Sequence, residues 1–84
     1  MTDEIVLGTV RKTPIGEIAD RAARAIAVRG EPLAVTFWPC GRLCLEPVED
    51  AAEDDIVGVY RGDRAFTLAR AIDSDLRFAV KGGA

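Results

Sequence analysis

The chain has 84 residues, of which 49% are hydrophobic, and its 11 basic and 14 acidic side chains give a formal net charge of −3. A chain of this size forms a single domain, residues 1–84, and buries only about 60 to 65% of its unfolded surface, which leaves little interior for a cofactor cavity. Residues 31–60 hold seven acids and one base. Such a negative block disfavours nucleic acid as a direct partner.

The residue types that most catalytic and metal sites need are scarce. There is no histidine, the commonest general base and metal ligand, and Ser74 is the only serine. Cys40 and Cys44 are too few for a structural zinc site, and three residues separate them where a redox pair has two. We therefore expect a protein that is not an enzyme and that holds no metal and no cofactor.

The N-terminal sequence MTDEIVLG has acids where a signal peptide needs positive charge. No window reaches the roughly 20 apolar residues of a membrane span. Two cysteines do not make a disulfide scaffold. We expect a cytoplasmic protein with reduced thiols and no membrane contact.

The first half of the chain predicts a strand, a helix and a hairpin. Alternating apolar residues predict a strand over residues 5–10. Thr13-Pro14 is a helix start, with the threonine as a cap, and apolar residues at helical spacing predict a helix from Pro14 to about Arg29 that ends at Gly30. Two alternating apolar segments then flank the turn Trp38-Pro39-Cys40-Gly41, which predicts a β-hairpin.

The second half predicts a strand over 56–60, a helix over 64–72 and a last strand, Leu76–Val80, after a break at Asp73-Ser74-Asp75. A strand through 66–68 is the competing interpretation of the helix, but a weak internal repeat of Asp-Arg-Ala and Ala-Arg-Ala-Ile favours the helix. Residues 82–84 read as a frayed tail. The predicted fold class is α+β, in the order β-α-β-β-(acidic turn)-β-α-β, with a largely antiparallel sheet and helices on one face.

Six carboxylates without any base follow the hairpin: Glu46, Glu49, Asp50, Glu53, Asp54 and Asp55. If residues 48–54 form a helical turn, two like-charge pairs result, each unfavourable by roughly 0.2 to 0.5 kcal/mol. One interpretation is a solvated loop that only improves solubility. The other is a docking surface, because carboxylates about 5 to 6 Å apart resemble the charge spacing of nucleic acid.

We therefore expect a small acidic protein that acts by protein–protein interaction. The six carboxylates would bind a partner with a basic surface, a nucleic-acid-handling protein, and inhibit it by nucleic-acid mimicry in a basic groove. Small acidic phage proteins that block bacterial nucleic-acid machinery, anti-CRISPR proteins among them, are similar in size and charge. We expect a monomer or weak homodimer.

A resemblance in the hairpin region supports an alternative function. Gly-Glu-Pro-Leu-Ala-Val-Thr from Gly30, then Gly41-Arg42, then Pro47-Val48-Glu49-Asp50 are similar to the hairpin of prevent-host-death antitoxins, which also follows a helix. The resemblance implies a dimeric repressor that binds operator DNA through N-terminal basic residues and neutralises a toxin.

Overall fold

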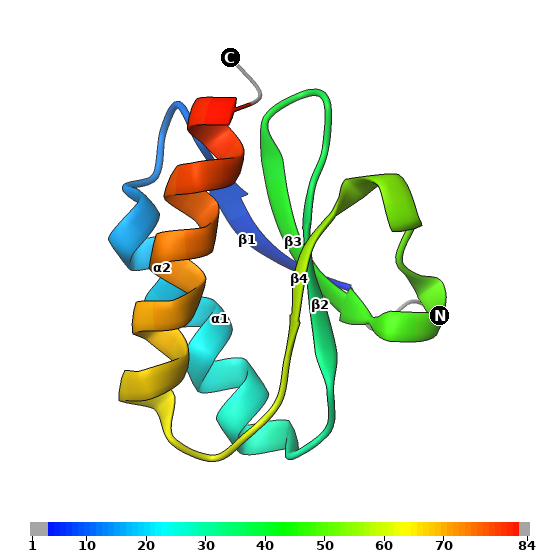
Figure 1. Ribbon diagram of the computed structural model, residues 1–84, viewed down its shortest axis with the longest axis vertical. Coiled ribbons are helices and arrows are strands. Elements are labelled where there is room, and N and C mark those ends of the chain that lie inside the picture. Colours follow the sequence, from blue (N-terminus) through cyan, green and yellow to red (C-terminus); the bar gives the residue numbers. More distant parts are fainter. Residues whose placement is uncertain (1–3, 83–84) are drawn as a thin grey trace.

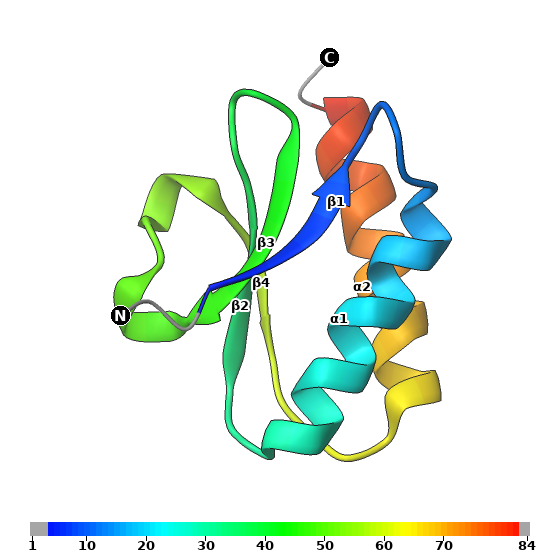
Figure 2. The same cartoon turned by 180° about the vertical axis from the view of Figure 1, so that it is seen from behind.

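A four-stranded sheet with two helices on one face makes up the computed structural model, which describes residues 4–82 (Figures 1 and 2). In chain order the elements are β1 (Ile5–Thr9), α1 (Ile15–Arg29), β2 (Leu33–Phe37), β3 (Arg42–Pro47), the single 3-10 turns η1 (Val48–Asp50) and η2 (Glu53–Asp55), β4 (Ile56–Tyr60) and α2 (Ala65–Gly82). The strand order is β1-β3-β2-β4, and all three neighbouring pairs are antiparallel. The predicted α+β class is therefore confirmed.

α1 connects two strands that lie on either side of β3. Because β1 and β2 both pair antiparallel with β3, they run parallel to each other, and α1 makes the crossover between them. The helix ends as predicted at Gly30, whose backbone is left-handed (φ 68°) and whose N–H donates to the Ile26 carbonyl oxygen at 3.0 Å. Within residues 4–82 no side chain caps its start, where Pro14 stands, so the predicted capping by Thr13 is wrong.

α2 is longer than predicted. It runs unbroken from Ala65 to Gly82, which confirms the helix over 64–72 and shows that the predicted last strand, Leu76–Val80, is wrong. Leu68, Ile72 and Leu76 are all buried and lie four residues apart, so the apolar face of the helix simply continues.

The predicted break at Asp73-Ser74-Asp75 does not occur, and both acids have hydrogen-bond partners. Asp73 accepts a hydrogen bond from Arg77 Nε at 3.0 Å, one turn further along α2. Asp75 accepts one from the hydroxyl of Tyr60 in β4. The predicted frayed tail of residues 82–84 falls partly outside the described residues, and its first residue, Gly82, closes α2.

The core lies between the helices and the inner face of the sheet. Its buried side chains are small and aliphatic: Leu7, Ile18, Ala19, Ala22, Ala23, Ile26, Leu33, Val35, Leu43, Leu45, Leu68, Ile72 and Leu76. The alternation along β2 and β3 places every second residue in this core and turns the others to the outer face. That outer face carries the acidic segment.

Candidate functional site

The acidic segment, residues 46–55, forms a lobe on the side of the sheet away from the helices (Figure 1). We call these ten residues the acidic lobe. Pro47 ends β3, and η1 and η2 are each a single turn, separated by Ala51 and Ala52 in extended conformation. The helical turn considered over residues 48–54 is therefore wrong, and with it the two like-charge pairs at helical spacing. The carboxylates follow the course of a folded-back loop instead.

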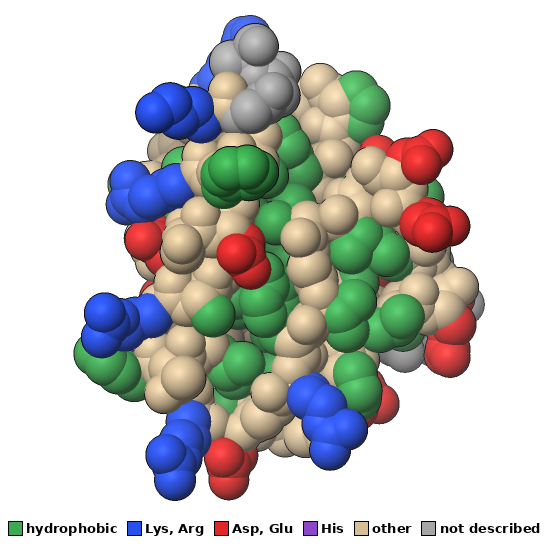
Figure 3. Space-filling view, viewed as in Figure 1, with side chains coloured by type: hydrophobic (Ala, Val, Ile, Leu, Met, Phe, Trp, Pro, Cys, Tyr) green, Lys and Arg blue, Asp and Glu red, His purple; other side chains and the backbone are tan. Residues whose placement is uncertain are grey.

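Four carboxylates of the acidic lobe are exposed: Glu49, Asp50, Glu53 and Asp54. The ion pairs found within residues 4–82 lie elsewhere, each within one helix, and join Glu17 to Arg21, Asp20 to Arg24, and Asp73 to Arg77. Figure 3 shows acidic side chains gathered over the lobe and basic ones along the helical side. The lobe therefore presents negative charge that the described part of the chain does not neutralise.

Glu46 differs from the exposed four because it is half-buried at the base of the lobe. The hydroxyl of Thr36, a fully buried residue, donates to Glu46 Oε2 at 2.8 Å and accepts from Trp38 Nε1 at 3.1 Å. The guanidinium of Arg42 stacks over the Trp38 ring, 5.7 Å from its centroid. These contacts cross from β2 to β3 on the outer face of the sheet and fix the point where the lobe leaves β3, so Glu46 is mainly an anchor at the base of the predicted surface.

A hollow of about 290 Å³ lies beneath the lobe, lined by Glu4, Trp38, Glu46, Asp50, Ala52 and Asp55. It brings together three of the six predicted residues, Glu46, Asp50 and Asp55. The other three, Glu49, Glu53 and Asp54, are not part of its lining. Glu4 was missed by the sequence analysis, because it reaches the lobe only through the pairing of β1 with β3.

Glu4 also affects the buried thiol of Cys44, whose Sγ lies 3.5 Å from Glu4 Oε1. Burial, reinforced by the negative charge of Glu4, raises the pKa of Cys44 to about 12. The thiol therefore stays protonated at neutral pH and does not act as a nucleophile. Cys40, in contrast, is exposed in the hairpin turn.

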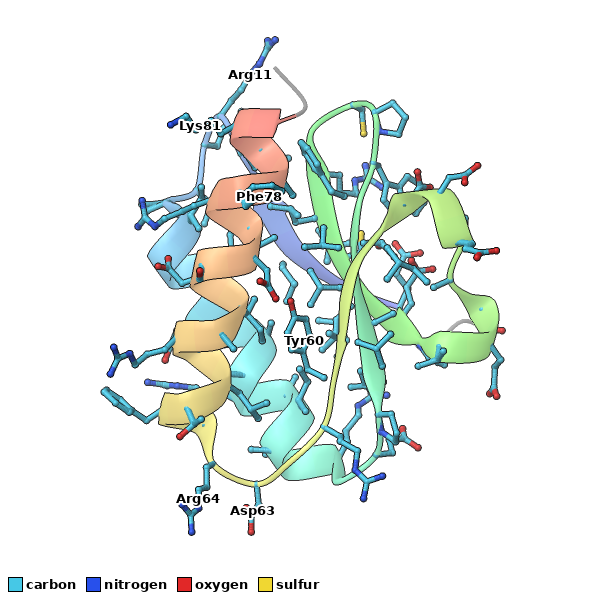
Figure 4. All side chains as sticks on the ribbon, viewed as in Figure 1. Arg11, Tyr60, Asp63, Arg64, Phe78 and Lys81 are labelled. Atoms are coloured by element: carbon cyan, nitrogen blue, oxygen red, sulfur yellow. The ribbon has the colours of Figure 1, made fainter. Side chains whose placement is uncertain are left out.

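A second hollow, of about 390 Å³, lies between the start of β4 and the C-terminal half of α2. We call it the β4–α2 groove; its lining consists of Phe37, Asp54, Asp55, Ile56, Val57, Asp75, Phe78 and Ala79. Figure 4 shows Phe78 on α2 above Tyr60, whose ring lies between the helix and β4. Phe78 was missed as a surface residue because the sequence placed it in a strand.

Tyr60 lies beside this groove and positions one of its acidic side chains. Its hydroxyl donates to Asp75 Oδ2 at 2.5 Å, and burial together with this bond raises the pKa of Tyr60. The ring lies over Gly58, where a Cβ atom would be 2.7 Å from the Tyr60 Cζ atom. The glycine thus makes room for the aromatic ring, and the ring positions the Asp75 carboxylate.

Two further features, a metal site and a membrane-spanning helix, were looked for among the described residues. Across residues 4–82, no three or more His, Cys, Asp or Glu side chains are grouped so as to hold a metal ion. Neither of the two described helices is long and apolar enough to cross a membrane. Comparison of the chain with protein-family models, curated proteins and solved structures finds no match.

Proposed function

We propose that the protein is a non-enzymatic inhibitor that presents its acidic lobe to the basic groove of a nucleic-acid-handling protein. The observation that carries this proposal is the charge of residues 46–55, six carboxylates without a base, of which four are exposed. The ion pairs of the described residues compensate acids on the helices instead. A phage-type, anti-CRISPR-like role is consistent with this combination of small size and localised negative charge.

Physical considerations favour binding over simple solvation of the lobe. Concentrated like charge opposes folding slightly, and the base of the segment is fixed on the sheet by the half-buried hydrogen bonds of Thr36 and Glu46. A concentrated negative surface accelerates association with a positive one and selects against other partners. Its contribution decreases as salt screens the charges.

The test neutralises the four exposed carboxylates by Glu49→Gln, Asp50→Asn, Glu53→Gln and Asp54→Asn. Affinity capture from host lysate identifies the partner, and titrations at increasing salt then compare the variant with the original protein. We expect binding to weaken at least about tenfold, equivalent to about 1.4 kcal/mol, and its salt dependence to flatten.

A control neutralises two acids outside the lobe that belong to none of the described ion pairs, Glu31 and Asp63, and is compared with the double variant Glu53→Gln, Asp54→Asn. Both control positions are exposed, so the control is also expected to fold. It should bind the partner within about twofold of the original protein, since charges distant from the interface contribute little to the affinity. Unchanged binding by the lobe variant would refute the proposal.

The antitoxin remains a second candidate because one feature of the fold favours it. α1 leads into the β2–β3 hairpin, as the resemblance implies. An antitoxin of this kind would bind operator DNA, and Arg11 and Lys12 are exposed next to the start of α1. A gel-shift assay with the DNA upstream of the protein's own coding sequence separates the candidates, since the inhibitor should leave that DNA unshifted.

A further inference from the structure

We propose that the β4–α2 groove is a docking site for an extended segment of the partner protein, with one aromatic or aliphatic anchor flanked by lysine or arginine. This inference rests on the proposed function and deepens it, because it names the part of the basic partner that would lie beside the acidic lobe. It is carried by three observations: an exposed aromatic side chain, an acidic rim and an uncovered strand edge.

The groove combines a hollow of adequate size with an exposed aromatic side chain. Its volume of about 390 Å³ falls within the roughly 300 to 1,000 Å³ typical of binding sites. Phe78, which forms one wall, is 81% exposed, whereas α2 buries Leu68, Ile72 and Leu76 in the core. An exposed aromatic ring beside an apolar hollow is the composition of an interface anchor site.

The charge of the groove indicates the chemistry of the occupant. Asp54, Asp55 and Asp75 contribute to the lining, and neither lysine nor arginine does so among the residues described. The Tyr60 hydroxyl holds Asp75 at the wall of the groove. Two of these three aspartates also belong to the acidic lobe, so a basic partner seated on the lobe has its surface next to the groove. Basic residues on both sides of an apolar anchor match this arrangement.

The edge of the sheet indicates an extended conformation for the occupant. The strand order makes β4 an edge strand, and its sequence, IVGVY, has neither the charge nor the proline that commonly protects an edge. Figure 3 shows the backbone of β4 along the middle of this face, with hydrophobic side chains on both sides. The groove borders this edge at Ile56 and Val57, next to the bulge at Val57, and an extended segment seated in the groove can add main-chain hydrogen bonds there.

The experiment uses the full chain labelled with ¹⁵N and a synthetic peptide, acetyl-Lys-Arg-Phe-Lys-Arg-amide, as the probe. A second peptide has serine in place of phenylalanine, and a third has glutamate in place of all four basic residues. We expect amide shift changes at residues 56–58 and 78–79, at least about fivefold tighter binding of the phenylalanine peptide than of the serine peptide, and no binding of the glutamate peptide.

Two substitutions on α2 form a matched pair. Phe78→Ser removes the anchor wall, whereas Phe66→Ser removes a phenylalanine of similar exposure, 75%, that is not part of this groove. Both positions are exposed, so both variants should fold. Phe78→Ser should abolish the advantage of the phenylalanine peptide over the serine peptide, and Phe66→Ser should preserve it.

Equal affinity for the phenylalanine and serine peptides would overturn the inference, as would equal effects of the two substitutions. A dimer of the free protein that Phe78→Ser disrupts would also overturn it, because a second copy would then be the occupant. Failure of the proposed function can be told apart from failure of this inference. In that case the four lobe substitutions leave the affinity for the partner unchanged. If those substitutions weaken partner binding while Phe78→Ser leaves it unchanged, the lobe is the interface and this inference alone falls.

Discussion

The two faces of the sheet are built from the same alternating strands but use them differently. The inner face is largely aliphatic, with Phe37 and Tyr60 packed against its aliphatic core, and is covered by both helices, as Val35 and Leu45 illustrate. The outer face is equally buried at its centre, but there the buried side chains are Ala34, Thr36 and Cys44, beneath the acidic lobe. Burial of apolar side chains on the inner face stabilises the fold. On the outer face the buried polar groups need hydrogen-bond partners, and these partners fix their positions.

The edges of the outer face sharpen this contrast. Val6 of β1 is 57% exposed and Val59 of β4 is 49% exposed, although both belong to strands whose inner-facing residues are covered. The lobe therefore covers only the middle of the outer face. The inner face is the product of hydrophobic patterning, and the outer face is a platform on which a charged surface is held.

The largest expected effect comes from the inner face. Leu45→Ala removes a side chain that is 1% exposed in the centre of the core and should lower the free energy of unfolding by about 2 to 5 kcal/mol. Urea denaturation followed by circular dichroism measures the change. Val28→Ala, at a position 86% exposed on α1, is the control and should stay within about 0.5 kcal/mol. A loss below about 1 kcal/mol at Leu45 would contradict the assigned core.

Thr36→Val tests the outer face with a smaller effect. The substitution keeps the shape but leaves the Trp38 indole N–H and the Glu46 carboxylate without their shared hydroxyl partner. We expect a loss of about 1 to 3 kcal/mol in the free energy of unfolding. The same replacement at Thr67, which is exposed on α2, should be nearly neutral. If both variants unfold at the same urea concentration, the outer face holds the lobe by other contacts.

The inner face was accessible from the sequence, because alternation and helical spacing follow directly from burial on one side. Residues 76–80 show where prediction from such spacing fails. In Leu76–Val80 apolar and other residues alternate, but Leu76 also continues the four-residue spacing of Leu68 and Ile72, and so short a run fits both periods. Packing against α1 decided in favour of the helix.

The candidate site was predicted in its charge but not in its shape. The six carboxylates are evident from the sequence, whereas their division into four exposed groups, the anchor Glu46 and the half-buried Asp55 depends on tertiary contacts. Glu4 and Asp75 join these acids from β1 and α2 across strand pairings and helix packing. No local pattern encodes such a meeting of distant segments.

A third prediction concerns the thiols and has an intermediate effect at alkaline pH. The pKa of Cys44 is raised in the folded protein from 9.0 to about 12, so the unfolded chain loses its proton first. The stabilisation is complete below pH 9 and disappears as the pH rises toward 12, with a loss of about 1 kcal/mol at pH 10. Unfolding of the original protein and of Cys44→Ala should converge over this range. Near neutral pH, a thiol reagent should modify the exposed Cys40 rapidly and Cys44 slowly.

The smallest expected effect on stability belongs to the four lobe substitutions that should have the largest effect on binding. Removing the exposed charges of Glu49, Asp50, Glu53 and Asp54 relieves mutual repulsion, so the free energy of unfolding should rise by up to about 0.5 kcal/mol at low salt. In 1 M salt the difference should vanish, because screening then acts over about 3 Å. A destabilisation above about 1 kcal/mol would mean that these carboxylates hold the lobe in place, and lost binding would then reflect lost structure. With a neutral or small positive change, the inner face supplies the stability, and any loss of binding by the variant is then due to the removed charges themselves.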